Sequence, residues 1–165
     1  MSETIQITEA NKYSTKDITK YVRQRLRAEF KDLKFSVRCE YYSMGSSMHI
    51  TILESKKVRF VKKYEEITDS EVLSMMSARN DTEAEVRGRI KKLQDTNNYQ
   101  VNQYHIETDW QFTEEGKKVL KRVLEIANKY NHDNSDIQSD YFDVNYYLHI
   151  NLGRWDKPFI DGVRK

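Results

Sequence analysis

The sequence predicts an α+β fold built from a pseudo-symmetric pair of α-β-β units. The units are expected to form one antiparallel sheet, with helices on one face and a helical insertion between them. Two observations carry this prediction: a helical pattern followed by alternating strand patterns occurs twice, and the two copies match at a fixed offset. The 165 residues fit a single domain over 1–165, with the first unit at about 14–53, the insertion at about 66–95 and the second unit at about 113–153.

The first unit begins with an amphipathic helix. Ser14 and Asp17 form a capping-box pattern, and apolar residues recur every four positions up to Lys31. Residues 34–42 then alternate between apolar and polar types, which is typical of a strand. Residues 43–47 predict a turn, with Gly45 suited to a positive φ, and a second strand over 48–52 completes a hairpin.

The insertion and the second unit follow the same rules. Two helices are expected in the insertion, capped at Thr68 or Asp69 and at Asn80 or Asp81. A short strand is expected over 101–106. Thr113 caps a long helix with acidic residues in its first turn, and strand alternation returns over 137–152.

The two units match at an offset of 100 residues. The identical pairs are Tyr41/Tyr141, His49/His149 and Ile50/Ile150. A helix and a hairpin cannot bury their apolar faces alone, whereas two copies can share one sheet. Such a sheet leaves its other face, or one end, free to bind a ligand.

Composition excludes several classes of protein. The formal net charge is only +2, which gives no global attraction to nucleic acid or membrane. A single cysteine, Cys39, excludes a disulfide framework and a cysteine-built zinc site. The N-terminal residues do not resemble a secretory signal, and no apolar run approaches a membrane span. A cytoplasmic protein without metal, cofactor or membrane contact is expected.

Basic residues are concentrated in the N-terminal part of the chain. Residues 1–65 hold 14 Lys and Arg against 8 Asp and Glu, whereas residues 66–165 hold 14 against 18. One face of the first helix carries a basic ridge, formed by Lys16, Lys20, Arg23 and Arg27. Such a ridge can follow the phosphates of a nucleic acid. The alternative interpretation is an ordinary solvated helix face.

Two strand motifs raise an enzymatic hypothesis. His49 and Thr51 stand in the hydrophobic-His-hydrophobic-Thr pattern of the two-histidine phosphoesterases, and His149 with Asn151 gives a second copy. One histidine would act as general base and the other as general acid on a phosphodiester. Asn151 replaces the usual hydroxyl residue of the motif, and an exposed strand histidine is also compatible with a plain surface position.

A third pattern lies on the last strand. Tyrosines and polar residues alternate on one face, at Tyr141, Asp143, Asn145, Tyr147, His149 and Asn151. Exposed tyrosines can stack on bases or anchor a protein partner. A solvated face in which tyrosine serves β-propensity is the alternative.

The motifs Lys34-Phe35-Ser36-Val37-Arg38 and Tyr42-Ser43-Met44-Gly45-Ser46-Ser47 resemble a large-polyvalent-protein-associated domain. The resemblance covers about residues 14–53 and departs from the family pattern at Met44 and His49. It implies an accessory protein of a phage or mobile element in a bacterial cytoplasm, acting against restriction or CRISPR defence, without an established enzymatic activity.

Three functional hypotheses follow. The leading one is a non-catalytic module that binds nucleic acid or a host nucleoprotein defence complex through the basic ridge and the turn residues Gly45, Ser46 and Ser47. The second is a two-histidine phosphodiesterase acting on cyclic nucleotides or RNA ends. The third is a protein-interaction or oligomerisation module, with a homodimer as one form.

Overall fold

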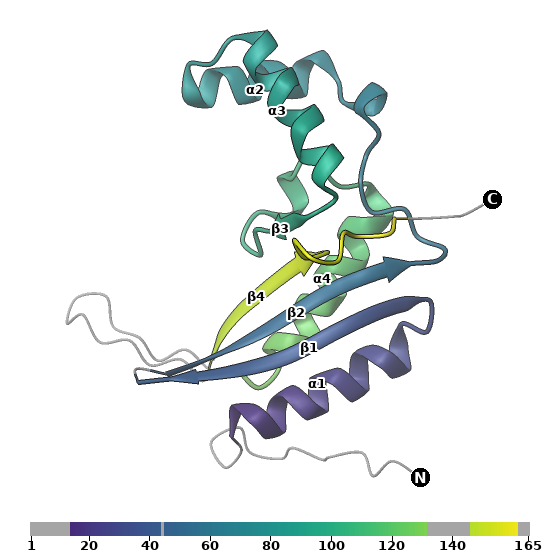
Figure 1. Cartoon of the computed structure of the whole chain (residues 1–165), viewed down its shortest axis with the longest axis vertical. Helices are drawn as coiled ribbons and strands as arrows, with labels where there is room; N and C mark the ends of the chain where they lie inside the picture. The colour runs from purple at the N-terminus through teal and green to yellow at the C-terminus, as the bar shows by residue number, and fades with distance from the viewer. Residues whose placement is uncertain (1–13, 44, 132–145, 162–165) are drawn as a thin grey trace.

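The computed structural model describes residues 14–43, 45–131 and 146–161. Within these ranges the helices are α1 (Thr15–Glu29), α2 (Asp69–Arg79), α3 (Glu83–Thr96) and α4 (Glu114–Asn128), with 3-10 turns at Tyr64–Glu66 and Ile106–Thr108. The strands are β1 (Leu33–Tyr42), β2 (Gly45–Ser55), β3 (Tyr99–Val101) and β4 (Tyr147–Leu152). They form one sheet in the order β1-β2-β4-β3 (Figure 1). The α+β class is therefore confirmed.

The sheet is mixed, where an antiparallel sheet was expected. β1 pairs with β2 and β3 pairs with β4 in antiparallel orientation, but the central strands β2 and β4 run parallel. Parallel neighbours need a long crossover, and the chain between these two strands contains α2, α3, β3 and α4. The parallel register joins residues 47–52 to 147–152, the same offset of 100 that relates the two sequence motifs. The strand pattern expected over 137–145 lies outside the described residues.

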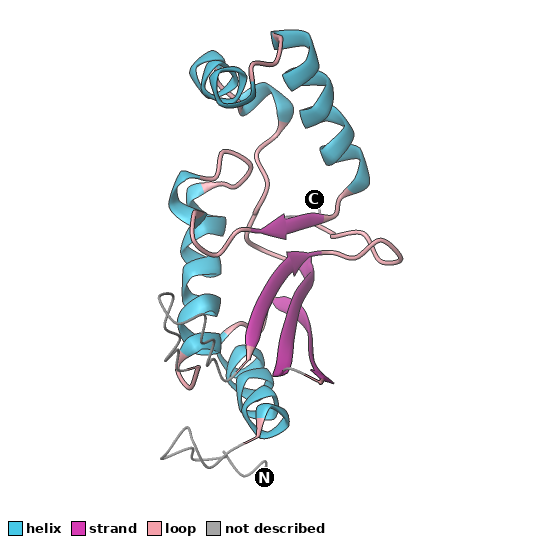
Figure 2. Cartoon of the chain, turned by 90° about the vertical axis from the view of Figure 1, so that its left-hand side faces the viewer, coloured by secondary structure: helices cyan, strands magenta, loops and turns pink. Residues whose placement is uncertain are grey.

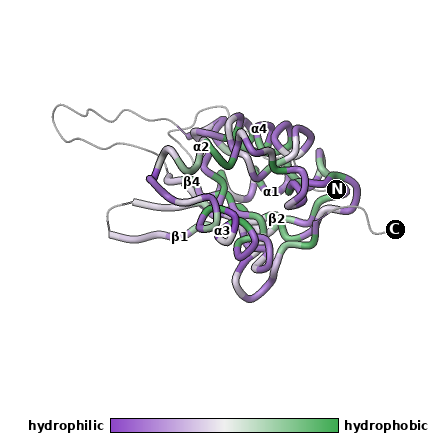
Figure 3. The backbone as a smooth tube through the Cα atoms, turned by 90° about the horizontal axis from the view of Figure 1, so that it is seen from above, coloured by the Kyte–Doolittle hydropathy of each residue, from purple (hydrophilic) through white to green (hydrophobic). Residues whose placement is uncertain are grey.

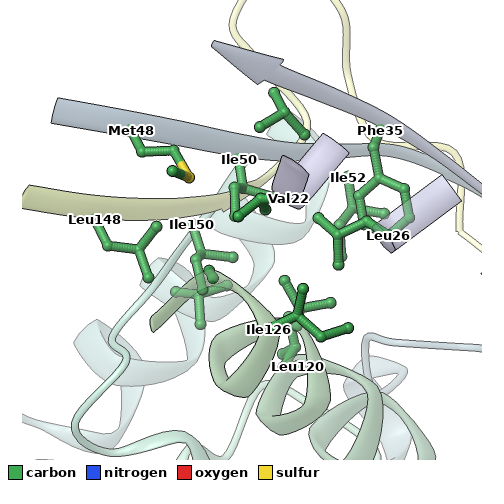
Figure 4. Close-up of a cluster of buried hydrophobic side chains, with 14 of the residues drawn as sticks. Val22, Leu26, Phe35, Met48, Ile50, Ile52, Leu120, Ile126, Leu148 and Ile150 are labelled. Atoms are coloured by element: carbon green, nitrogen blue, oxygen red, sulfur yellow. The ribbon is translucent and has the colours of Figure 1, made fainter. Parts of the chain in front are cut away.

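Helices α1 and α4 cover one face of the sheet (Figure 2). Apolar residues at alternate positions of β1, β2 and β4 meet the apolar stripes of both helices, and the side chains at the centre are at most 2% exposed (Figure 4). They include Val22, Leu26, Ile50, Ile52, Leu120, Ile150 and Leu152. At the surface, the guanidinium of Arg122 on α4 contacts both carboxylate oxygens of Glu29 on α1, which lowers the pKa of Glu29. The two helices are thus joined by packing and by a charged pair.

Helix caps follow the predicted chemistry with one exception. Ser14 and Asp17 form the capping box of α1, Thr68 caps α2, and the side chain of Thr113 accepts a hydrogen bond from the first turn of α4. The cap of α3 is Thr82, not Asn80 or Asp81. Asn80 instead ends α2 in the left-handed conformation, at φ 58°, a role to which asparagine is well suited.

The strand boundaries also differ in two places. β3 spans Tyr99–Val101, earlier than the expected 101–106. The predicted turn over 43–47 is shorter, because β2 already begins at Gly45 and pairs with Tyr42. Gly45 has the expected positive φ, at 154°.

The insertion helices form a lobe at one end of the molecule (Figure 1). Ile67, Val72, Val86 and Ile90 make a small core of their own between α2 and α3. In Figure 3 the hydrophobic stretches gather where α1, α4 and β2 come together, while the outer part of the β1–β2 hairpin is hydrophilic to neutral. Within the described ranges, every helix is too short or too polar to span a bilayer.

Candidate ligand-binding face of the sheet

The face of the sheet opposite α1 and α4 carries polar and aromatic side chains. Alternation along each strand places them there, because their neighbours point into the core. Strand pairing sorts them into three rows across the sheet. The rows are Glu40–Ser47–Tyr147, Arg38–His49–His149 and Ser36–Thr51–Asn151–Gln100. We call this surface the open face.

His49 and His149 lie side by side in the middle row. Their ring centroids are 4.8 Å apart and the ring planes differ by 12°, so the rings stack. The contact follows from the parallel, in-register pairing of β2 with β4, which places equivalent residues of the two motifs next to each other. The side chain of His49 is 35% exposed, and His149 is exposed. Both rings are therefore accessible to a ligand.

The surroundings of His49 favour its neutral form. Partial burial and the neighbouring His149 lower the pKa of His49 below its ordinary value of 6.5, and Arg38 acts in the same direction. The carboxylate of Glu40 lies 3.5 Å from Nε2 of His49 and opposes this shift. The imidazole of His49 is therefore mostly neutral at pH 7.

Removing His149 should raise the pKa of His49. We expect NMR titration to place the midpoint of His49 below 6.5 in the native chain, to raise it in His149→Ala, and to lower it further in Glu40→Gln. Because the pKa of His49 is lowered in the native fold, the unfolded chain binds the His49 proton more readily than the folded chain. The free energy of unfolding of the native chain therefore falls as the pH decreases below 6.5. Identical His49 midpoints in all three proteins would contradict the pairing of the two rings.

Two tyrosines extend the open face towards the tip of the hairpin. A Cβ atom placed on Gly45 would lie 3.7 Å from the ring of Tyr42 and 3.9 Å from the ring of Tyr147. The hydroxyl of Tyr42 also forms a 3.0 Å hydrogen bond with Oγ of Ser47. Both tyrosines are 43% exposed. Tyr42, Tyr147 and the histidine pair thus place aromatic rings along one polar surface.

The predicted basic ridge is divided by the structure. Lys16 and Lys20 are exposed on α1, whereas Arg23 donates a hydrogen bond to the carbonyl oxygen of Val37 on the edge strand β1. Arg27 lines a cavity at the corner between α1 and β1. Because α1 packs against the core face of the sheet, Lys16 and Lys20 belong to a different layer from the open face.

The serines of the predicted turn are engaged within the fold. Ser46 is 6% exposed, and its Oγ lies 2.6 Å from Oγ1 of Thr15 at the start of α1. Ser47 is 5% exposed and contacts Tyr42 as described. The first contact joins the hairpin to α1, and the second joins its two strands. Of the tyrosine-rich strand, Tyr147 is described, while Tyr141, Asp143 and Asn145 lie outside the described residues.

Arg38 and Tyr42 were not among the predicted site residues. Both belong to the polar positions of the β1 alternation, and the hairpin register pairs Arg38 with His49. A shorter turn, with the second strand beginning at Gly45, would have led to the pairing of Arg38 with His49 from the sequence. No hydrogen bond or ion pair joins the side chain of Arg38 to another described residue, so its charge remains available.

The two residues that would hold the phosphate in the two-histidine motifs, Thr51 and Asn151, are less accessible than His149. Thr51 is only 4% exposed and pairs with Asn151, which is half-buried. Among the residues that the structure describes, no group of three or more His, Cys, Asp or Glu side chains is placed to hold a metal ion.

Comparison with protein families assigns the chain to one of them. Residues 13–113 match the family described as large polyvalent protein associated domain 29. This range covers more than half of the chain, so the chain belongs to that family, as its sequence motifs predicted. The match includes β1, β2 and the insertion, and it ends before α4 and β4. No curated protein and no solved structure matched the chain.

Proposed function

We propose that the protein is an accessory protein of a phage or mobile element that binds single-stranded nucleic acid on the open face. The observation that supports this most strongly is the line of accessible rings beside a free arginine. Tyr42 and Tyr147 lie near the hairpin tip, and the stacked histidines lie next to Arg38. Such aromatic platforms stack on unpaired bases, while a cation neutralises phosphate.

The open face favours a single strand over a duplex. Stacking requires exposed base faces, which a double helix keeps inside. The net charge of +2 and the presence of Glu40 on the face keep non-specific attraction weak. The affinity for nucleic acid would therefore depend on contacts at the open face. An anti-defence role would follow if the bound strand were a single-stranded guide, a transcript or a displaced DNA strand.

Arg38→Glu should weaken binding of single-stranded RNA by about tenfold, because it reverses the charge beside the histidine pair. Fluorescence anisotropy of a labelled single strand over a salt series measures this, and each phosphate contact contributes about −0.7 to the slope of log K against log salt. The slope should become shallower in Arg38→Glu. Lys118→Glu is the control, since Lys118 is exposed on α4 away from the open face.

Absence of binding by the native chain at low salt would rule out this function. Self-association that does not respond to salt would then favour the oligomerisation module. If Arg38→Glu and Lys118→Glu weakened RNA binding equally, binding would depend on the overall charge of the protein. That result would contradict the role of the open face.

A second candidate function is phosphodiester hydrolysis by the histidine pair. The stacking of His49 and His149 on adjacent strands favours it. Neutral His49 would take a proton from water, and the water oxygen would form a bond to phosphorus. The P–O ester bond would break as protonated His149 donates to the leaving oxygen. The burial of Thr51 argues against a hydroxyl contact to the phosphate.

A cleavage assay separates the two functions. The enzyme hypothesis predicts turnover of a cyclic dinucleotide or an RNA 2′,3′-cyclic end, with a loss of 10²- to 10⁴-fold in His49→Gln and in His149→Gln. The binding hypothesis predicts no product from the native protein. Turnover that persists unchanged in both variants would indicate a contaminating enzyme.

A further inference from the structure

A basic cavity lies at the corner between the end of α1 and the start of β1. Its volume is about 400 Å³. Four cationic side chains line it, and they come from the end of α1, the following loop, β1 and the chain after β2. They are Arg27, Lys31, Lys34 and Lys56. Two carboxylates, Asp32 and Glu54, also line the cavity, so it has an excess of positive charge.

The positive charges of this cavity are only partly offset within the described part of the chain. Asp32 has an ion-pair partner outside the lining, Lys57, with its Oδ2 3.6 Å from Nζ. None of the four lining cations forms an ion pair or a side-chain hydrogen bond with a described residue. All four are exposed, so they can close on an anion without breaking an existing contact.

The cavity is continuous with the open face along β1. Lys34 occupies the same face of the strand as Ser36 and Arg38. It lies four residues from Arg38, which corresponds to about 13 Å along an extended strand. A chain of phosphates whose bases stack on the open face can therefore pass Arg38 and reach Lys34.

We propose that this cavity binds a phosphate group of the nucleic acid strand that lies on the open face. This proposal rests on the proposed function and adds where the strand is held and by which groups. Lysine and arginine side chains converging on a concave site suit a phosphate, whose oxygens accept several charge-assisted hydrogen bonds. The phosphate is either an internal phosphodiester or a terminal phosphomonoester, which share this chemistry.

The test compares Lys31→Ala/Lys56→Ala with the control Lys92→Ala/Lys118→Ala, which removes the same charge from exposed positions on α3 and α4. Anisotropy is measured with two single strands of one sequence, with and without a 5′-phosphate. An internal phosphate predicts about five- to tenfold weaker binding of both strands and a salt slope shallower by about 0.7, the contribution of one phosphate contact. A terminal phosphate predicts weakening of the phosphorylated strand alone.

An experiment without nucleic acid distinguishes the phosphate site from the proposed function of the open face. Titration of the native chain with inorganic tripolyphosphate should shift the backbone amide NMR signals of residues 31–35, and the cavity variant should lose these shifts. If no oligonucleotide binds but these shifts occur, the open-face function fails and the phosphate site stands. Unchanged affinity and salt slope in the cavity variant, or no amide shifts at 31–35, would overturn the proposal even where Arg38→Glu weakens binding.

Discussion

Gly153→Ala is expected to destabilise the protein by about 3–5 kcal/mol, a large part of a typical free energy of unfolding. Gly153 has φ 74°, a conformation that costs a non-glycine residue about 1–3 kcal/mol. A Cβ atom there would lie 2.5 Å from the backbone nitrogen of Phe159 and 2.6 Å from the carbonyl oxygen of Asn97. These two atoms form a 2.7 Å hydrogen bond, which the methyl group would force apart.

Thermal unfolding followed by circular dichroism measures this effect, and we expect a melting temperature about 10 °C lower. Gly88→Ala provides the matched control. Gly88 lies inside α3 with no atom within 4 Å of the added Cβ, so this change should stabilise the helix by about 0.5–1 kcal/mol. Equal melting temperatures for Gly153→Ala and the native chain would contradict the close packing of Phe159 and Asn97 around Gly153.

Loss of both histidine rings is expected to weaken binding of single-stranded RNA by about 30- to 100-fold. Each base stacked on an aromatic ring contributes about 1–3 kcal/mol, and His49 with His149 provides a stacked pair on the open face. His49→Ala/His149→Ala removes both rings while leaving the strand backbones able to pair. Anisotropy at constant salt and pH measures the change in dissociation constant.

Lys16→Ala/Lys20→Ala is the control for this experiment, because these exposed lysines lie on α1, in the layer on the other side of the sheet. It should change affinity less than threefold. If the lysine variant loses affinity and the histidine variant keeps it, nucleic acid binds the helix layer and the open face is not the site.

Local chemistry made much of the fold predictable. Ser14, Thr68 and Thr113 cap their helices because the side-chain oxygen satisfies a backbone N–H that the helix leaves free. The sequence offset of 100 also anticipated that His49 and His149 occupy equivalent positions, which strand pairing then placed side by side. These features depend on residues close in sequence or on a repeated pattern.

Features that depend on distant parts of the chain were not predictable in the same way. Periodicity does not give strand direction, so the parallel pairing of β2 with β4 was missed. The charge pattern of α1 did not reveal that Arg23 bonds to the edge of β1. Ser46 matched a turn by composition, yet Thr15 engages it across 31 positions of the chain.

The most direct test of the open face is NMR mapping of the native chain with a short single-stranded RNA. Backbone and imidazole signals are followed during titration. We predict the largest shifts at Arg38, His49, Tyr147 and His149, with Lys16 and Lys20 unchanged. Shifts confined to α1 or to the α2–α3 lobe, or no shifts at saturating RNA, would contradict the assignment of the open face as the binding site.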